Sequence, residues 1–400
     1  MKTDLDVLIA GGGMVGATLA CALDESGLRV GVIEPQASQA TAGEYGLRVS
    51  AITLASQTVF ENLGVWSRVQ PVSPVEAMRI WEGGGVLNFD AAEIGEPCLA
   101  WIVENRVLVA ALTERLRAMP EIQWFSPASL ADIEIGEDAV HARLDNGRTL
   151  SARLLVGADG AVSRVRAAAG IGWTRHDLAQ SAIVAVVKTE TPHRRTAYQH
   201  FLPTGPLAFL PLDDPRTVSI VWSADTARAD GLMKLDETAF NAELQSAFGD
   251  SLGRVQLASA RAVIPLALGF AETYTAHRIA LIGDAAHTVH PLAGQGVNLG
   301  ILDAATLAET LLAAVKAKRD VGQQPLLRRY ERTRKGADVG MQLVTGGFRY
   351  LFGSELPGLR PLRNAGLALT EKFPPLKNYF MRRASGLAGE LPRLAQRVLR

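Results

Sequence analysis

The sequence predicts an α/β protein with a nucleotide-binding domain, a second and mostly antiparallel sheet inserted into it, and a helical C-terminal segment. Three observations support this architecture. A strand–glycine turn–helix–strand pattern opens the chain, strand-like runs separated by turn residues fill residues 180–264, and helical periodicity with many basic residues ends it. The chain has 400 residues, 48% of them hydrophobic, enough to bury the cores of two packed domains.

Charge and cysteine content exclude several classes of protein. Lys and Arg together number 41, as do Asp and Glu, so no overall charge favours nucleic acid and we expect no such partner. Cys21 and Cys98 form no CxxC pair or Cys/His cluster, which argues against a disulfide framework and a metal site and fits a reducing cytoplasm. Residues 7–23 are uncharged, but glycines interrupt them, so we expect a nucleotide-binding turn rather than a membrane span.

The chain opens with a β-α-β dinucleotide-binding pattern of the Rossmann type. Its parts are strand 5–10, Gly11-x-Gly13-x-x-Gly16, helix 14–25, strand 29–33 and Glu34. The first glycine permits a tight turn, the second lets a pyrophosphate approach the backbone, and the third lets the helix pack closely. The Glu34 carboxylate can accept hydrogen bonds from a ribose diol and disfavours a 2′-phosphate. The pattern therefore predicts FAD or NAD rather than NADP.

Two arginines follow at places that suit a long ligand with two phosphates. Arg48 precedes a predicted amphipathic helix, and Arg106 falls in the first turn of a predicted helix capped by Asn105. Guanidinium groups bind phosphate oxygens through paired hydrogen bonds. Surface ion pairs are the alternative interpretation of both arginines, and the sequence leaves both interpretations open.

The middle of the chain alternates as strands do. Residues 139–144 and 148–156 flank an Asp-Asn-Gly turn and predict a hairpin that leads to a second tight turn at Asp159-Gly160. One helix is predicted at 237–248, and the other strands of the inserted sheet are predicted at 79–90, 183–188, 197–202, 207–211, 218–222 and 260–265. No second β-α-β pattern occurs, so the sequence indicates no separate nicotinamide-nucleotide domain.

The stretch after residue 278 predicts an anion-binding turn. Its parts are a strand at 279–282, Gly283-Asp284, a loop with Pro291, Gly294 and Gly296, and a helix starting near Val297. A glycine-rich loop that enters a helix leaves backbone N–H groups available to a group of negative charge.

The expected domain boundaries follow from this order. The nucleotide-binding domain takes 1–75, 97–178 and 268–344, the inserted sheet 76–96 and 179–267, and the C-terminal segment 345–400. That last segment has a formal charge of +7 and interleaves basic with aromatic residues. Such a segment can lie on anionic lipid, dock a partner or cap its own body, and the sequence does not decide among these.

Four features in one order resemble the single-component flavoprotein aromatic hydroxylases, whose archetype is para-hydroxybenzoate hydroxylase. They are the Gly11/Gly13/Gly16 pattern, Arg48, the Asp159-Gly160 turn, and Gly283-Asp284 followed by the Pro291 loop. The run from His290 to Gly300, HPLAGQGVNLG, with Asp303 after it, resembles the signature of the ubiquinone-biosynthesis hydroxylases. Residues 47–52 and 328–332 are most similar to the bacterial 2-polyprenylphenol hydroxylases that install the C5 oxygen.

The resemblance implies an FAD-binding fold of the para-hydroxybenzoate hydroxylase type, with the substrate under the inserted sheet. The implied FAD contacts are Gly11, Gly13, Met14, Val15, Gly16, Glu34, Arg48, Ser50, Ala51, Arg106, Asp159, Gly283, Asp284, Pro291, Gly294, Gln295, Gly296, Val297 and Asn298. Among them, Glu34 would bind the adenosine ribose, Asp284 the ribityl chain, and residues 295–298 the pyrimidine edge of the flavin. Candidate substrate contacts on the inserted sheet are Tyr198, Phe209, Pro211 and Trp222.

The implied activity is hydroxylation of a polyprenylated phenol in ubiquinone biosynthesis, with C5 as the expected ring position. NAD(P)H would reduce FAD, and O2 would form a C4a-hydroperoxyflavin that oxygenates the ring. The implied partners are the lipophilic phenol, a quinone-biosynthesis complex, a second copy of the chain and the inner face of the cytoplasmic membrane. His287 and His290 are the weak candidates for a catalytic base, although histidines beside such a turn usually serve the structure.

Four alternatives remain open at this point. A flavin halogenase would share the first pattern, but its Trp-x-Trp-x-Ile-Pro motif is missing from the sequence. A prenyl-chain reductase would have a related fold, and a non-catalytic FAD-binding scaffold would consume no O2 with any phenol. Related hydroxylases that act on another ring position or another aromatic substrate share most of the motifs.

Overall fold

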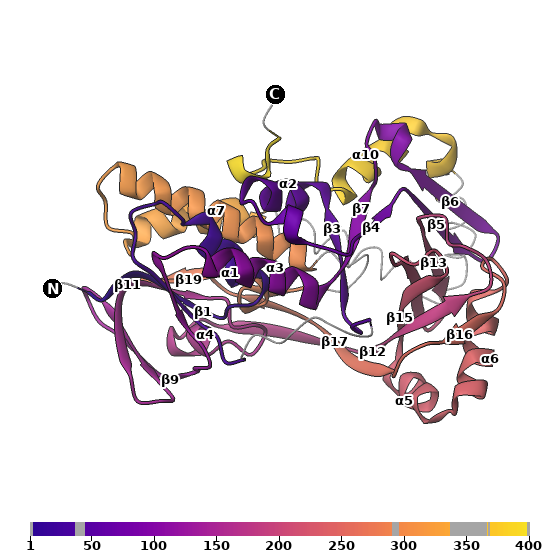
Figure 1. Cartoon of the computed structure of the whole chain (residues 1–400), viewed down its shortest axis with the longest axis horizontal. Helices are drawn as coiled ribbons and strands as arrows, with labels where there is room; N and C mark the ends of the chain where they lie inside the picture. The colour runs from indigo at the N-terminus through magenta and orange to yellow at the C-terminus, as the bar shows by residue number, and fades with distance from the viewer. Residues whose placement is uncertain (1–2, 37–44, 290–295, 337–365, 367–368, 398–400) are drawn as a thin grey trace.

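The first domain is built on a parallel sheet with the strand order β8-β2-β1-β11-β19 (Figure 1). These strands are Leu5–Ala10 (β1), Val30–Ile33 (β2), Ile122–Phe125 (β8), Thr149–Gly157 (β11) and Ile279–Leu281 (β19). Val140–Leu144 (β10) pairs antiparallel with β11 and forms the predicted hairpin, and Leu130–Ile135 (β9) pairs with β10. Thr275–Ala276 (β18) pairs with β19. The structure is a computed structural model, and it describes residues 3–36, 45–289, 296–336, 366 and 369–397.

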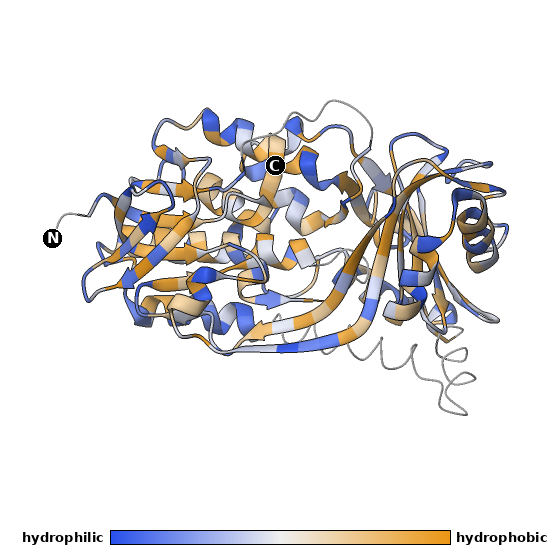
Figure 2. Ribbon diagram, turned by 90° about the horizontal axis from the view of Figure 1, so that it is seen from below, coloured by the Kyte–Doolittle hydropathy of each residue, from blue (hydrophilic) through white to orange (hydrophobic). Residues whose placement is uncertain are grey.

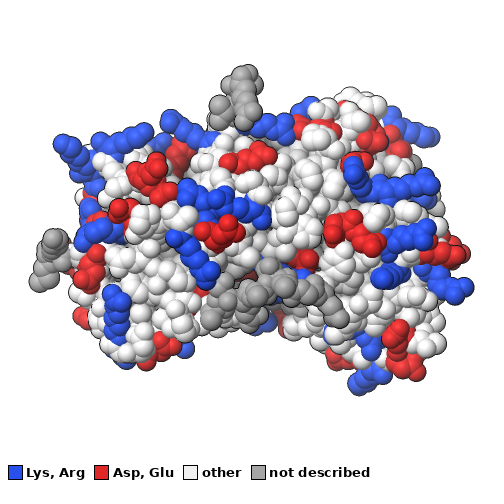
Figure 3. Space-filling view, in the orientation of Figure 1, with Lys and Arg blue, Asp and Glu red and all other residues white. Residues whose placement is uncertain are grey.

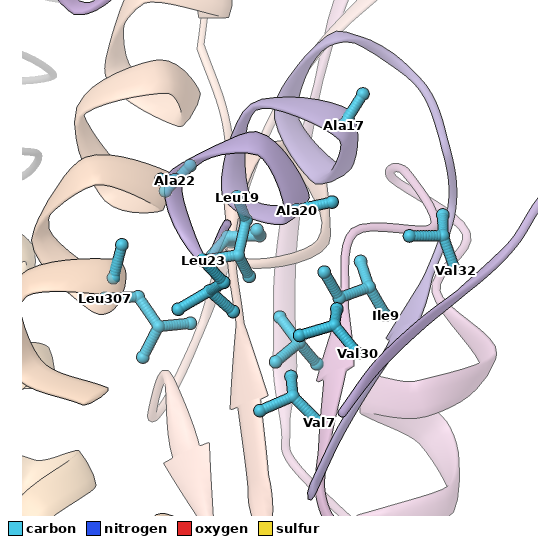
Figure 4. Close-up of a cluster of buried hydrophobic side chains, with 14 of the residues drawn as sticks. Val7, Ile9, Ala17, Leu19, Ala20, Ala22, Leu23, Val30, Val32 and Leu307 are labelled. Carbon is cyan, nitrogen blue, oxygen red and sulfur yellow. The ribbon is translucent and has the colours of Figure 1, made fainter. Parts of the chain in front are cut away.

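Helices cover this sheet. They are Met14–Ala22 (α1), Asn105–Arg117 (α3), Arg164–Ala168 (α4), Gly296–Lys316 (α7) and residues 324–336. The uncharged helix α1 is buried along most of its length because it packs against β1, β2, α3 and α7. Figure 4 shows Leu19 and Leu23 of α1 close to Val7, Val30 and Leu307. Burial of each such side chain contributes about 1.5–3 kcal/mol relative to exposure.

The second domain is a larger sheet with the order β20-β17-β12-β15-β14-β13-β5-β6, and β16 pairs with β12. Its strands are Ala77–Glu82 (β5), Gly85–Asp90 (β6), Trp173–Thr189 (β12), Thr196–Leu202 (β13), Gly205–Pro211 (β14), Thr217–Asp225 (β15), Val255–Leu257 (β16), Ala262–Ala271 (β17) and His287–Thr288 (β20). All its pairs are antiparallel except β13 with β5, as the prediction of a mostly antiparallel sheet requires.

Helices Thr226–Lys234 (α5) and Glu237–Phe248 (α6) cover one face of this sheet. The sequence predicted only α6, because the short and largely polar α5 has little helical periodicity. Strands β12 and β17 are longer than predicted and run from one domain into the other (Figures 1 and 2). They cross the predicted boundaries at residues 178 and 267, so no flexible linker occurs at either place.

A three-stranded sheet, β3-β7-β4, lies between the two larger sheets. Its strands are Val49–Thr53 (β3), Ser73–Val75 (β4) and Ala100–Glu104 (β7), and Leu54–Asn62 (α2) and Trp66–Arg68 (η1) follow β3. Ala51, Val75 and Ile102 from this small sheet pack against Val186 and Leu210 of the large one. The face of the large sheet opposite α5 and α6 is thus turned toward the first domain.

The described part of the C-terminal segment packs on the body of the protein. It contains Pro374–Ala384 (α10) and Arg393–Ala395 (η5), and α10 contacts Ala91–Ile94 (η2). By length and composition, α7 is the one helix in the described ranges that could cross a membrane, but 67% of its apolar stretch is buried inside the protein. Lys, Arg, Asp and Glu side chains are interspersed on the face shown in Figure 3.

Gly16→Ala should destabilise the FAD-free protein, because a methyl group at this position would lie 1.9 Å from the Gly11 carbonyl oxygen. Overpacking of this kind costs about 1–3 kcal/mol or more. Gly13→Ala is the matched control, since nothing lies within 4 Å of its added methyl group. Thermal unfolding of both FAD-free variants tests this, and equal melting temperatures for Gly16→Ala and wild type would contradict the close contact.

Candidate active site

Three turns meet at the carboxyl edge of the parallel sheet, where ligands bind in open α/β folds. Gly11 follows β1 with φ +103°, and a side chain there would lie 2.3 Å from the Ala158 carbonyl oxygen of the turn after β11. Val15 of α1 fills the space beside the third turn, since side chains at Gly283 and at Gly300 would both meet it. The structure therefore brings the predicted fingerprint, the Asp159 turn and the Asp284 turn together.

The glycine turn after β1 has one open position. A side chain at Gly12 would meet Trp124 at 2.5 Å, whereas one at Gly13, the N-cap residue of α1, would meet nothing within 4 Å. The backbone of Gly13 is thus accessible at the N-terminus of a helix, where anions bind favourably. Trp124 was not predicted, because nothing in the sequence links it to a turn more than a hundred residues earlier.

Glu34 is held in place by backbone N–H groups. Its Oε2 accepts a hydrogen bond from Gly12 N at 2.8 Å, and its Oε1 accepts one from Gln36 N at 2.9 Å. The carboxylate therefore lies beside the glycine turn, at the position where a dinucleotide ribose binds in this fold.

Asp159 uses one carboxylate oxygen to cap a helix. Its Oδ2 accepts hydrogen bonds from Arg164 N at 2.7 Å and Val165 N at 3.2 Å. Its Oδ1 is buried and accepts no hydrogen bond from the described residues. A buried acceptor without a donor is costly, so this atom marks a place where a ligand donor would be favourable.

A buried arginine ties the Asp159 turn to the Asp284 turn. Arg166 donates hydrogen bonds to Ala285 O at 2.9 Å and to Ala161 O at 2.7 Å. Its guanidinium lies 3.8 Å from the ring centroid of Trp173, the first residue of β12. Burial lowers the pKa of Arg166. Arg166 was not predicted as a site residue, because a basic residue in a short helix gives no signal of such contacts.

Asp284 is exposed to solvent, yet the protein around it disfavours the charged form of its carboxylate. It lies in the short helix Gly283–Ala285 (η3), and the protein around it desolvates the carboxylate. This desolvation raises the pKa of Asp284, although His287 and the exposed Arg48 act to lower it. A desolvated carboxylate with a raised pKa, at the meeting point of three turns, is typical of a functional position.

Below this turn lies a fully buried carboxylate. Asp303 of α7 accepts hydrogen bonds from Gly283 N at 3.0 Å, from His287 Nε2 at 2.6 Å and from Arg334 Nε at 2.6 Å. Burial opposes its charge, but His287 and Arg334 hold the pKa of Asp303 at about 2. His287 is itself buried, which favours a structural role for this candidate base, and His290 lies outside the described residues.

Asn298 joins the start of α7 to β3. Its Nδ2 donates to Ala51 O at 2.7 Å, and its Oδ1 accepts from Thr53 N at 2.9 Å. Ser50, also on β3, donates to Asn105 Oδ1 at 2.7 Å. The side chain of Asn298 therefore fixes the strand predicted to pass beside the isoalloxazine. Gly296 and Val297 open α7, whereas Pro291, Gly294 and Gln295 lie outside the described residues.

The two predicted phosphate-binding arginines differ in their surroundings. Arg48 is exposed, whereas Arg106 Nε lies 2.9 Å from Oε2 of the buried Glu104. Glu104 also accepts a hydrogen bond from Gly46 N, so this pair anchors the segment that carries Arg48. Asn105 is the first residue of α3 rather than its cap, because Glu104 takes the N-cap position.

The predicted substrate contacts lie elsewhere. Phe209 stacks on Phe248 of α6 at 3.7 Å, and Trp222 packs near Phe240 of the same helix. Tyr198 belongs to this cluster, and the buried Pro211 shares the alternation of Phe209 along β14. These side chains form the core under α5 and α6, so the structure does not bring them to the three turns. Their neighbours on the opposite face, such as Leu210 and Val221, face the first domain.

Comparison with known proteins identifies the family. Residues 4–346 match the family described as FAD binding domain. Ubiquinone hydroxylase UbiL of Rhodospirillum rubrum is 42% identical over 400 residues, covering 98% of this chain and 93% of that protein. The chain belongs to the ubiquinone-biosynthesis family of FAD-dependent hydroxylases. The 3-demethoxyubiquinol 3-hydroxylase of Escherichia coli is 38% identical to this hydroxylase over 387 residues. The alignment covers 96% of this chain and 98% of the E. coli protein.

Solved structures confirm the fold of this hydroxylase. p-Nitrophenol 4-monooxygenase PnpA from Pseudomonas putida superposes with a TM-score of 0.80 at 20% identity, covering 97% of this chain and 99% of its own. PqsL of P. aeruginosa superposes with a TM-score of 0.77 at 24% identity, and the superposition covers 92% of this chain and 100% of PqsL. The FAD-binding domain with an inserted antiparallel sheet, predicted from the sequence, is therefore confirmed.

The described residues fit FAD. The open side of Gly13, the carboxylate of Glu34, the unsatisfied Oδ1 of Asp159 and the desolvated Asp284 lie along one edge of the parallel sheet. Among the residues that the structure describes, no group of three His, Cys, Asp or Glu side chains could hold a metal ion.

Gly13→Ala should leave the fold intact but weaken FAD binding by at least about tenfold, because its methyl group would occupy the approach to the backbone. Titration of the FAD-free variant with FAD, followed by flavin fluorescence, gives the dissociation constant. Wild-type affinity in a variant with wild-type melting temperature would place the diphosphate elsewhere.

Asp284→Asn should weaken FAD binding while keeping or raising the melting temperature of the FAD-free protein at neutral pH. The reason is the raised pKa of Asp284, which means that its charged form destabilises the folded chain above the unfolded-state pKa. FAD titration and thermal unfolding of one protein preparation measure both effects. Unchanged FAD affinity in this variant would remove Asp284 from the site.

Asp303→Asn should lower the free energy of unfolding by about 3–5 kcal/mol, because it removes the charge that compensates Arg334 in the interior. Asp320→Asn is the matched control. Asp320 also accepts from two arginines, Arg278 and Arg153, but is partly exposed, so its loss should cost about 1 kcal/mol. Only Asp303→Asn should also weaken FAD binding.

The same carboxylate predicts a pH dependence. Since the pKa of Asp303 falls from 3.8 to about 2 on folding, its stabilisation is complete above the higher value and is lost as the pH falls toward the lower one. The loss amounts to about 2 kcal/mol. Denaturant unfolding over this acid range should show a shallower pH dependence in Asp303→Asn than in wild type.

Proposed function

We propose that this FAD-dependent monooxygenase hydroxylates the ring of a polyprenylated phenol in ubiquinone biosynthesis. The observation that carries the proposal is the near full-length similarity to ubiquinone hydroxylases, together with the FAD-binding residues at the edge of the parallel sheet. The finer proposal is ring carbon C5, which rests on residues 47–52 and 328–332. The name of the E. coli relative favours a second candidate, hydroxylation of a demethoxyubiquinol.

The chemistry divides between cofactor and protein. Bound FAD takes electrons from NAD(P)H and activates O2 for transfer to the ring. The protein would bind and orient FAD: Glu34 and the open Gly13 backbone would hold the nucleotide half, and Asp284 and β3 would lie beside the flavin half. The N-terminus of α7, at Gly296, favours negative charge beside it.

The face of the large sheet that α5 and α6 leave uncovered suits a lipophilic ring. Ala182, Leu266 and Val221 form one apolar cluster there, and Val186 and Leu210 of the same face pack against the three-stranded sheet. Such apolar side chains exclude water from the reacting groups and offer no charged group that could anchor a carboxylate. A polyprenylated phenol fits this surface better than a charged benzoate.

Val221→Trp tests this placement. The bulkier side chain on the uncovered face should raise KM for the phenol at least about tenfold and leave FAD content unchanged. Tyr198→Phe, on the face covered by α6, is the control and should keep wild-type kinetics. The opposite pattern would return the substrate to the residues first predicted from the sequence.

Activity and ring position need one further experiment. The purified holoenzyme, supplied with NAD(P)H, O2 and a short-chain polyprenylphenol, should yield a product heavier by one oxygen atom. Complementation of bacterial strains that lack individual quinone hydroxylases should then succeed only for the strain blocked at the matching position. No consumption of O2 with any phenol, together with no complementation, would favour the scaffold alternative.

A further inference from the structure

One side of the C-terminal segment is fastened to both domains. Lys377 Nζ lies 2.7 Å from Glu93 Oε1, beside the second sheet, and Arg397 pairs with Glu96 at 2.7 Å. Ser385 O accepts a hydrogen bond from Leu54 N of α2 at 3.1 Å. Lys377 and Met381, one turn apart on α10, are buried. The inward side of α10 is therefore fixed by the body of the protein.

The other side of this segment exposes large apolar side chains. Leu369 is 64% exposed, Phe373 54% and Tyr379 52%. In the described part of the chain, only Val162 and Val263 are comparably exposed large hydrophobic residues. Tyr379 lies two residues after the buried Lys377, which places it on the opposite side of the helix. These three exposed residues fall within one short stretch, whereas scattered exposure is the rule for soluble surfaces.

The charge on this side is positive. Lys372 and Arg382 are exposed, although Arg382 Nη2 also donates a hydrogen bond to Ile94 O at 3.2 Å, and Arg383 Nη1 lies 3.4 Å from the Tyr379 hydroxyl. Glu371 is the one acidic residue in the sequence from 366 to 389. Its carboxylate is already engaged, since it accepts from Asn88 N at 2.8 Å and lies 3.9 Å from Lys377. No acidic side chain in this stretch is left to offset the outward basic residues.

We propose that the outward side of α10 and the residues before it dock the protein on a bilayer that contains anionic lipid. Aromatic rings with a polar tip insert at the level of the lipid headgroups, and basic side chains beside them contact the phosphates. The proposed docking face is Leu369, Lys372, Phe373, Tyr379, Arg382 and Arg383. Figure 1 shows α10 near the upper edge of the molecule in this view.

Two features favour a bilayer over a protein partner. The exposed side belongs to a convex helix rather than a groove, and it combines basic with aromatic residues, as interfacial helices do. The inference rests on the proposed function in one respect. A lipophilic phenol is dissolved in the membrane, so an enzyme held at the bilayer surface meets its substrate there.

Co-sedimentation of the holoprotein with vesicles tests the proposal. Wild type should bind vesicles of phosphatidylcholine mixed with phosphatidylglycerol, bind pure phosphatidylcholine much less, and release as salt is raised. Arg382→Gln/Arg383→Gln should lower the partition coefficient on the anionic vesicles by at least about tenfold. Phe373→Ser/Tyr379→Ser removes the two exposed aromatic rings and should weaken binding by a similar factor.

Matched controls come from the same chain. Arg216→Gln/Arg254→Gln removes two exposed charges on the second domain, and Val162→Ser removes the most exposed apolar side chain, at 91%. Both should bind as wild type does. Failure of wild type to bind anionic vesicles, or equal loss in the controls, would overturn the proposal. So would self-association or binding of another protein through this face while vesicles are ignored.

The readouts separate this proposal from the proposed function. Vesicle binding is measured without any phenol, and turnover of a short-chain, water-soluble phenol should be the same in the docking variants and in wild type. A wild-type protein that binds vesicles but hydroxylates no phenol would refute the function and leave the docking surface standing.

Discussion

The geometry around the cofactor depends on one buried negative charge. A carboxylate removed from water is stable only when nearby donors and cations compensate it. For Asp303 this compensation comes from the turn after β19, from His287 and from Arg334. Residues 283–287, Asp303 and Arg334 must therefore come together before the charge is satisfied. The position of the Asp284 turn relative to α7 follows from that requirement.

The parts of the site that could be predicted are those whose conformation depends on a short run of neighbouring residues. Gly11 needs a positive φ, and Gly16 must lie against a neighbouring carbonyl, so a sequence pattern reveals both. The strand ends that carry Glu34 and Asp284 also follow from short runs of residues. The same holds for the hairpin β10–β11 and for the mostly antiparallel character of the second sheet.

The parts that could not be predicted depend on which faces meet. Alternation along β14 and β15 identifies two sets of side chains, but not which set lies under helices. The unpredicted α5, with α6, covers the set that contains Phe209 and Trp222, so these substrate candidates lie on the face that packs under helices. Arg334 and Trp124 gave no sequence signal because their roles depend on contacts made only in the folded chain.

In the C-terminal segment, too, the sequence does not show which side chains meet in the folded protein. Its composition indicates a basic region, but it does not show which charges are matched by acids elsewhere. Glu93, Glu96 and Glu309 satisfy Lys377, Arg397 and Arg393. Only the remaining basic residues are available to anything outside the protein.

The two long strands have a mechanical consequence. Trp173, at the start of β12, stacks on Arg166 in the first domain, while Ile183 on the same strand is in the core of the second. β12 and β17 stay hydrogen-bonded across this junction, with a register shift between Asp177 and Gln180. Relative rotation of the domains must therefore twist a two-stranded ribbon instead of turning about a single flexible segment. We expect such a hydrogen-bonded connection to restrict the rotation of one domain relative to the other.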